Sequence, residues 1–442
     1  MLKRFFVILA ILGFLLSNAL AQESKKIMTL EECIQIALRN NIQVIAAENE
    51  YKAKQSEEIG AWGNFLPRVD AGLGYTSRRT GPTFRTFQDP ETGTFYPGLS
   101  TSVTNWSYSF GLNASQNIFD GGYSWYNLAL KKAAKSSSYD GLLIERQNLV
   151  YSVKQKYFNV LQAKMLLEIQ KDAVKRGEEQ LKLVQARFDL GAASWSEVLK
   201  AKVQYGNEEL LLVQAENNLN LANADLNFIL AQDVNTPLEV AEHLSKPELE
   251  YTYDSGLKQA LLSHPSISKA ENDKQVAQSQ LGLARSGLMP SLGISFNYDW
   301  ANKDFDQIEN INKRDYSWRI STALNFNIFD RLVTKTNISR AKQGLKTAAE
   351  MYEQSKNEVT LELKQAFLSI QEAEERIKLT EKNAKSTEED LKLTKERYNL
   401  GAATILELLD SQVSHKKAQS DQVQALYDYN LAVARSEKAI GK

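Results

Sequence analysis

The 442-residue chain carries 53 basic and 54 acidic residues, and this near-balance gives no support to a nucleic-acid-binding surface. Its mean hydropathy of −0.39 is too polar for a membrane protein built from many apolar helices. With only 8 prolines and 22 glycines, a disordered or loop-rich chain is also excluded.

Residues 1–21 read as a secretory signal peptide. A basic start precedes an apolar run at 5–16, and Ala19-Leu20-Ala21 offers a small-residue cleavage site. We therefore expect export from the cytoplasm. The remaining chain keeps one cysteine, Cys33, which cannot form an internal disulfide.

The predicted elements of the first half begin with a helix opened by a capping box at Thr29 and Glu32. Strands follow at about 67–77 and 105–119, separated by a long loop at 78–105 that carries Arg78, Arg79 and Arg85. A proline-free run then extends from 120 to 190. As one helix it would reach roughly 100 Å, so we expect long helices paired as coiled coils.

The second half repeats the first. The tetrapeptide NIFD recurs at 117–120 and 327–330, and LGAA at 190–193 and 400–403, each 210 residues apart. We therefore predict two similar halves, 22–230 and 251–442, joined by a linker at 231–250. The strands of the second half fall at about 290–300 and 315–329.

All four strands alternate apolar and small polar residues, which fits either a soluble sheet or a membrane barrel. Their length and their aromatic ends favour the barrel, in which the aromatics would form half of a membrane-interface girdle. These aromatics are Tyr75, Trp106, Tyr108, Tyr298, Trp300, Tyr316 and Trp318. Four strands cannot close a barrel, so oligomerisation is required; a trimer would supply twelve strands, whereas a dimer leaves little room for a pore.

The LGAA copies predict hairpin tips at 190–194 and 400–404. Gly191 and Gly401 suit the left-handed position that ends a helix. Ser194 and Thr404 then look like N-caps, with Glu197 and Glu407 completing capping boxes. Asp410 adds acidity to the second tip alone, and it also fits a solvated helix-start charge.

The sequence predicts no enzyme. No His/Cys cluster has metal-ligand spacing, and neither a phosphate-binding P-loop nor a nucleophile elbow occurs. We therefore expect no catalytic residues, no cofactor and no metal.

The signal peptide, the duplicated halves, NIFDGG at 117–122 and the R-[FY]-x-L-G tips together resemble the TolC family of outer-membrane efflux proteins. The resemblance covers essentially the whole mature chain. It implies an α+β membrane protein with a long α-helical coiled-coil barrel in the periplasm. It also implies a trimeric 12-stranded β-barrel in outer-membrane lipid, with four strands per protomer.

The resemblance further implies a passive exit duct for small molecules such as drugs, toxic compounds or metals. A periplasmic adaptor and an inner-membrane RND or ABC pump would be its partners. Two alternatives remain open: the outer-membrane duct of a type I protein secretion system, and a periplasmic coiled-coil adaptor.

At the tips, the resemblance assigns Glu407 and Asp410 to carboxylate rings at the periplasmic entrance. Tyr398 takes the family's latch tyrosine position, and Ser196 and Glu197 the acceptor positions. The latch arginine position holds Ala403 instead. We therefore expect Tyr398 to bond to Glu197 in a gate that lacks half of the family's latch.

Overall fold

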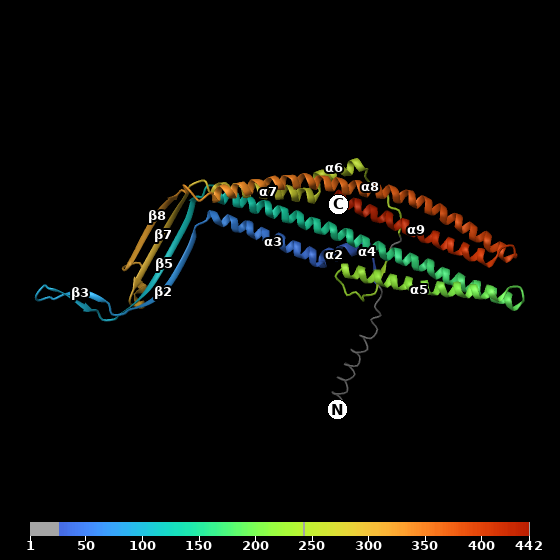
Figure 1. Ribbon diagram of the computed structural model, residues 1–442, viewed down its shortest axis with the longest axis horizontal. Coiled ribbons are helices and arrows are strands. Elements are labelled where there is room, and N and C mark those ends of the chain that lie inside the picture. The colour runs from blue at the N-terminus through green and yellow to red at the C-terminus, as the bar shows by residue number, and fades with distance from the viewer. Residues whose placement is uncertain (1–25, 242–243, 442) are drawn as a thin grey trace, which may run out of the picture. The chain divides into compact units, whose positions relative to one another are not determined.

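The computed structural model describes residues 26–241 and 244–441 (Figure 1). The predicted signal peptide, residues 1–21, lies outside the described residues. The described chain divides into two compact units: residues 26–51, 137–271 and 351–441 in one, and residues 52–136 and 272–350 in the other. Each unit therefore draws on both halves of the sequence.

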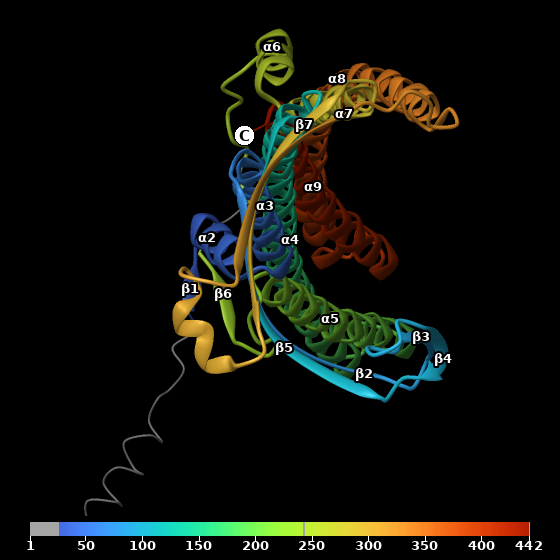
Figure 2. The same cartoon turned by 90° about the vertical axis from the view of Figure 1, so that its left-hand side faces the viewer.

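The second unit contains a four-stranded antiparallel sheet (Figure 2). Its strands are β2 (Arg68–Thr80), β5 (Val103–Phe119), β7 (Ser291–Asn302) and β8 (Tyr316–Asn325), in the order β2-β5-β7-β8. The prediction that the last strand reaches residue 329 is wrong. Asn325 pairs with Ser291, and the next residue outward on β7 is Pro290, which has no N–H to continue the ladder.

The register gathers the apolar side chains of all four strands on one face. Val69, Ala114, Phe296 and Ile320 form one row across the sheet. The next rows toward the inter-strand connections are Ala71–Leu112–Tyr298–Trp318 and Leu73–Phe110–Trp300–Tyr316. The opposite face carries small and polar residues such as Gly72, Gly111, Asp299 and Ser317.

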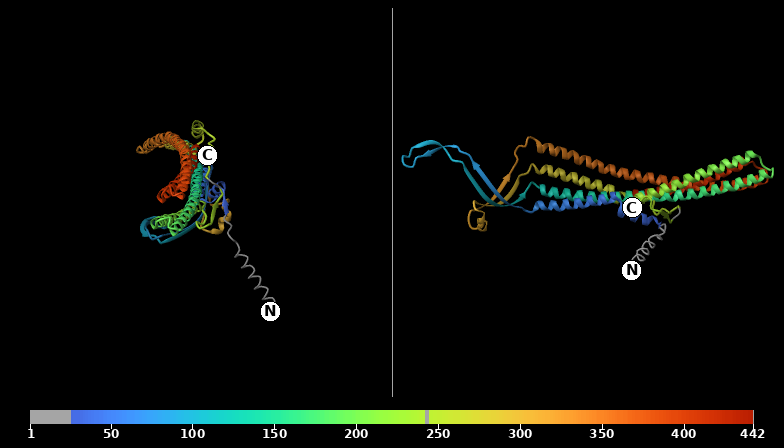
Figure 3. Two further views of the ribbon diagram at one scale, coloured as in Figure 1. Left: turned by 90° about the vertical axis from the view of Figure 1, so that its right-hand side faces the viewer. Right: turned by 90° about the horizontal axis from the view of Figure 1, so that it is seen from below.

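The prediction of a simple loop at 78–105 is wrong. Arg78 and Arg79 belong to β2, and a separate hairpin follows, made of β3 (Phe84–Gln88) and β4 (Phe95–Leu99) (Figure 3). Its turn is stabilised by Asp89, whose carboxylate accepts a hydrogen bond of 2.8 Å from the Glu91 N–H. The two strands are only five residues long each, so their pattern was too short to distinguish from a loop.

Two pairs of long helices are confirmed. They are α4 (Tyr123–Asp189) with α5 (Trp195–Ile229), and α8 (Val333–Asn399) with α9 (Ile405–Ile440). The shorter helix of each half is broken in two: α2 (Leu30–Asn40) and α3 (Ile42–Trp62), then α6 (Tyr253–Ser263) and α7 (Pro265–Ser286). No helix in the described ranges carries an apolar stretch long enough to cross a membrane.

The capping box at Thr29 and Glu32 opens α2 as predicted. Next to it, β1 (Lys26–Met28) pairs in parallel with β6 (Leu238–Val240), which lies in the predicted linker. Two 3-10 helices complete the fold, η1 (Gly63–Phe65) and η2 (Phe305–Asn310). A buried cluster around Tyr157 joins α4 to β1, since the Tyr157 hydroxyl donates to the Met28 carbonyl at 3.3 Å.

The repeated NIFD motif starts the two longest helices. Asp120 accepts a hydrogen bond from the Ser124 N–H at 3.0 Å, and Asp330 accepts one from the Thr334 N–H at 2.7 Å. The two residues after each Asp have positive φ. In the first copy they are Gly121 and Gly122, but in the second they are Arg331 (+56°) and Leu332 (+67°). The second copy therefore holds two side chains in a conformation that L-residues disfavour.

Candidate functional site

The sharp turn between the helices of each pair is built by one glycine. Gly191 has φ +74°; its N–H donates to the Phe188 carbonyl at 2.9 Å, and the Ala192 N–H donates to the Arg187 carbonyl at 2.7 Å. Gly401 has φ +73° and the same two bonds. This pair of hydrogen bonds caps the carbonyls at a helix end. It requires the left-handed conformation, which glycine adopts without strain.

Each returning helix starts with a reciprocal cap. The Ser194 hydroxyl accepts from the Glu197 N–H at 3.3 Å, while Glu197 accepts from the Ser194 N–H at 3.4 Å. Thr404 and Glu407 make the same pair of bonds, at 3.3 and 3.2 Å. The Thr404 N–H and hydroxyl lower the pKa of Glu407, because both groups favour the carboxylate form. Asp410 lies exposed one turn further on.

The two hairpins are joined at their tips by Arg187. Its guanidinium lies over the Tyr398 ring, 4.8 Å from the centroid. It also donates to the Tyr398 and Asn399 carbonyls, at 3.3 Å each. These are carbonyls at the end of α8, where the helix dipole favours a cation. Arg187 therefore binds the second hairpin through charge, hydrogen bonds and ring stacking together.

The predicted hydrogen bond between Tyr398 and Glu197 is not formed. Tyr398 is only 4% exposed, and its hydroxyl has no hydrogen-bond partner among the described residues. Burial among Val184, Val198 and Leu408 raises its pKa. Glu197 is engaged by its own helix cap, and Ser196 is exposed. The polar contact from the first hairpin to Tyr398 thus comes from Arg187, for which the sequence predicted no role.

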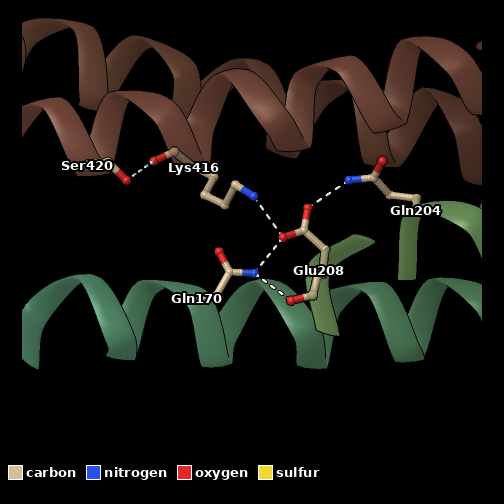
Figure 4. Close-up of polar contacts among 5 residues, drawn as sticks. All are labelled: Gln170, Gln204, Glu208, Lys416 and Ser420. Carbon is tan, nitrogen blue, oxygen red and sulfur yellow. Dashed lines mark hydrogen bonds and ion pairs between the residues drawn. The ribbon is translucent and has the colours of Figure 1, made fainter. Parts of the chain in front are cut away.

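A second link between the hairpins is buried deeper in the helices (Figure 4). Glu208 of α5 accepts a charge-assisted bond of 2.7 Å from Lys416 of α9. Gln170 of α4 and Gln204 also donate to the same carboxylate, at 2.7 Å each. The Glu208 and Lys416 side chains are 7% and 17% exposed. No local pattern signals this link, since Gln170, Glu208 and Lys416 lie far apart in the chain.

The predicted interface aromatics fall on the apolar face of the sheet, near the connections between strands. Tyr75 and Tyr108 contact each other, and Tyr298 stacks on Tyr316. Trp106 and Trp318 are exposed, but Trp300 is only 1% exposed. Tyr108 contacts Phe305 of η2, and the Tyr298 hydroxyl donates to the Ile311 carbonyl at 2.5 Å. The β7–β8 connection therefore lies over this end of the apolar face.

Among residues 26–241 and 244–441, no group of three or more His, Cys, Asp or Glu side chains is arranged to hold a metal ion. The polar groups at the tips serve as caps and links between helices.

A family model described as "Outer membrane efflux protein" matches residues 33–232 and 256–442. The chain belongs to the outer membrane efflux protein family. It is thus an efflux protein of the bacterial outer membrane, and not an enzyme. The alternative of a periplasmic adaptor is overturned by this match.

The chain is 26% identical over 425 residues to the pyoverdine export outer membrane protein OpmQ of Pseudomonas aeruginosa, covering 93% of this chain and 83% of OpmQ. It is 25% identical to the outer membrane protein TolC of Vibrio cholerae, covering 75% and 76% of the two chains. The solved structure of the Campylobacter jejuni CmeC outer membrane channel matches with a TM-score of 0.81 at 19% identity, covering 93% and 85%. The last match shows the fold: long helices and a four-stranded sheet built from two repeats.

Proposed function

We propose that three copies of this chain assemble into a passive exit duct, with a twelve-stranded barrel in the outer membrane and a helical tunnel in the periplasm. The observation that carries this proposal is a pair of uncovered apolar stripes on the helices of the first unit. On α5 the stripe is formed by Leu199, Val203, Leu210 and Leu221. On α8 it is formed by Leu361, Leu368, Leu379 and Leu393.

The helical spacing places each set on one side of its helix, since their positions differ by near-multiples of whole turns. Large exposed apolar side chains that recur along one side of a helix indicate a contact surface in a polar chain. The repeat supports a second copy of the chain as the partner. The counterparts of Leu368 and Leu379, 210 residues earlier, are Phe158 and Ile169 of α4, and these are packed within the chain against a cluster that includes Val423 and Leu426 of α9.

In the first repeat, therefore, the same positions are covered by α9 of the same chain. In the second repeat, Leu368 and Leu379 of α8 are exposed instead. The helix that corresponds to α9 in the other repeat, and could cover them in the same way, is α5. The bare stripe of α8 is thus complementary to the α5 stripe of another copy. A head-to-tail contact of this kind closes into a ring when the rotation per copy is right.

The sheet of the second unit supports the same assembly. Strands β2 and β8 are its two edges. Open edges are not tolerated in lipid, so the β8 edge of one copy must pair with the β2 edge of the next. Three four-stranded sheets supply the twelve strands that a water-filled barrel needs.

The periplasmic entrance of this duct lies at the hairpin tips. Trimer symmetry brings three copies of Glu407 and Asp410 around one axis, where the carboxylates would attract cations and resist close approach. Because the duct itself holds no energy source, we propose that it works with a periplasmic adaptor and an RND or ABC pump of the inner membrane. Its cargo is a small molecule, as the name of the relative OpmQ states for pyoverdine in that protein.

The assembly is tested by chemical cross-linking of the outer-membrane protein and by its conductance in planar bilayers. Wild type should give trimers and discrete channels. Leu379→Glu, on the α8 stripe, should reduce both, while Leu262→Glu, an exposed leucine of α6, should reduce neither. A monomer that carries no current would contradict the duct.

Cargo is tested in a deletion strain. Loss of the gene should raise sensitivity to small toxic compounds, and the wild-type gene should restore resistance. Unchanged sensitivity with a loss of secreted polypeptide would instead support a duct for protein secretion.

A further inference from the structure

The helical parts of the second unit, next to the four-stranded sheet, carry an excess of positive charge. Residues 52–66, 120–136, 272–290 and 330–350 hold 12 basic and 6 acidic residues. The whole chain has a net charge of −1, so this excess is local. Figure 1 shows these helices meeting the sheet at the end away from its inter-strand connections. A basic zone therefore borders that end of the sheet.

In the first repeat, the helix ends of this zone carry exposed aromatic rings. The ring centroid of Phe65 in η1 lies 5.8 Å from that of Trp62 in α3 and 4.8 Å from that of Trp125 in α4. The Lys132 Nζ lies 5.2 Å from the Trp62 ring centroid, in a cation–π contact. Trp62 and Trp125 nevertheless remain 48% and 65% exposed. Large rings gathered in one place and left this open indicate a contact surface.

The second repeat places cations at the positions of these residues. Positions before the first strand of each half lie 223 residues apart, as Pro67 and Pro290 show, and positions after the second strand lie 210 apart. The counterparts of Trp62, Trp125 and Lys132 are Arg285, Lys335 and Lys342. The helix-end patch comprises Trp62, Phe65, Trp125, Lys132, Arg285, Lys335 and Lys342.

The acidic residues of α3 in this zone are paired with lysines of α4. Glu57 lies 2.7 Å from Lys131, and Glu58 lies 2.6 Å from Lys135. The three cations that the patch draws from the second repeat are exposed, and none of them forms an ion pair with a described residue. These three cations are therefore available to an anion from outside the chain.

The patch lies on the same side as the apolar face of the sheet. Asn117, on the polar face of β5, lines a pocket together with Tyr123 and Ser124 at the start of α4. Those two residues of α4 therefore point toward the polar side. Trp125 lies roughly 150° around the helix from their midpoint, since each residue turns the helix by about 100°. Lys132, seven residues further on, lies on the side of Trp125.

The patch also lies about one apolar membrane thickness from the aromatic end of the sheet. From Ser291 to Trp300, β7 is about 30 Å long, because a strand rises about 3.3 Å per residue. At a tilt of about 40°, this length spans roughly 23 Å along the membrane normal, close to the height of about 25 Å of the apolar band in membrane barrels. With Trp300 at the outer interface, the helix ends before Ser291 lie at the inner interface.

From these observations we propose that the helix-end patch binds the headgroups of anionic phospholipids in the inner leaflet of the outer membrane. Tryptophan rings favour the membrane–water interface, and lysine or arginine near a membrane surface attracts anionic headgroups. A lipid fits better than a protein partner, because the patch adjoins the apolar face of the sheet at the level of the headgroups. This binding rests on the membrane barrel proposed above.

Brominated lipids, which quench nearby tryptophan, test the binding on the intact channel in phosphatidylcholine nanodiscs. The reporter is Leu288→Trp with all six native tryptophans replaced by phenylalanine. Leu288 is the exposed counterpart of Phe65, so the new ring lies beside the cations of the patch. A small fraction of brominated phosphatidylglycerol should quench it at least threefold more than the same fraction of brominated phosphatidylcholine. A second reporter that keeps Trp318 alone should be quenched equally by both lipids.

Charge removal in the Leu288→Trp reporter identifies the cause. Each cation near an anionic surface strengthens lipid binding about fivefold, so removing three should weaken it roughly 100-fold. Arg285→Gln/Lys335→Gln/Lys342→Gln should therefore abolish the excess quenching by phosphatidylglycerol. The matched control, Arg78→Gln/Arg79→Gln/Arg85→Gln, removes the same charge beyond the other end of the sheet and should leave the excess unchanged. If the triple patch variant forms no channels, its three single variants should each lower the excess.

The two reporters separate this inference from the proposed barrel. If Trp318 is quenched but Leu288→Trp is quenched equally by both lipids, or by neither, the barrel stands and the inference is overturned. An excess that survives removal of the patch cations also overturns it. If neither lipid quenches Trp318, the membrane barrel itself is wrong.

Discussion

The substitution Lys416→Met tests the buried link between the hairpins. It removes the cation and leaves the Glu208 carboxylate in the interior with only Gln170 and Gln204 as donors. Removing one partner of a buried ion pair costs about 3 to 5 kcal/mol. Because Lys416 keeps some contact with solvent, we expect the lower end, about 3 kcal/mol.

Hydrogen–deuterium exchange of the detergent-solubilised trimer measures this loss locally. A cost of about 3 kcal/mol accelerates exchange by local opening roughly 100-fold, since each factor of ten corresponds to about 1.4 kcal/mol. The acceleration should be confined to peptides around Glu208 and Lys416. The double variant Glu208→Met/Lys416→Met should recover most of the protection, because a buried pair can often be replaced by apolar side chains at little cost.

The exposed pair Glu178–Lys182 on α4 supplies the control. Glu178→Gln should change exchange by less than about fivefold, because an exposed pair contributes under about 1 kcal/mol. If Lys416→Met changes exchange no more than this control does, the buried pair does not hold the hairpins together.

Three further predictions follow from the caps and the sheet. The pKa of Glu407 is 4.5 in the unfolded chain and lower in the folded protein, so its carboxylate stabilises the start of α9 only above these values. Protection of the α9 start from exchange should therefore fall as the pH drops below 4.5 toward the folded pKa. Glu407→Gln should remove this pH dependence of exchange. Arg331→Gly should stabilise the protein by about 0.5 to 1 kcal/mol, because glycine relieves the strain of a positive φ. Gly121→Ala should destabilise it, because an added Cβ would lie 2.7 Å from the Ser286 carbonyl oxygen. Thermal inactivation of the trimer measures both effects. In single-tryptophan variants, brominated lipid should quench Trp318 strongly and Trp300 weakly, and equal quenching would show that the β7–β8 connection leaves the apolar face in the membrane.

The sequence predicted those parts of the fold that depend on local pattern. The long runs without proline located α4 and α8, and LGAA followed by Ser or Thr and Glu located the turns, because capping depends on residues a few positions apart. The β3–β4 hairpin was missed because its strands are short, and β6 was missed because three residues of a parallel pair have no distinctive pattern.

The contacts at the candidate site were predictable only in part. The family resemblance indicated Tyr398, but its partner is Arg187, which lies 211 positions away. A basic residue in the last turn of a helix signals an interaction with helix-end carbonyls, yet nothing local says whether those carbonyls belong to its own helix or to another. The Glu208–Lys416 pair likewise depends on how α5 and α9 pack, which no local pattern specifies.

The duplication of the chain has a consequence for how such a protein can evolve. A ring built from six identical hairpins would carry every substitution six times. A charged residue could then not be placed on every second hairpin tip and left out of the others. Here the two tips are encoded separately. The first tip has Lys200 where the second tip has Asp410. One tip can therefore lack an acidic residue that the other tip keeps, without a second gene or a change in the number of subunits.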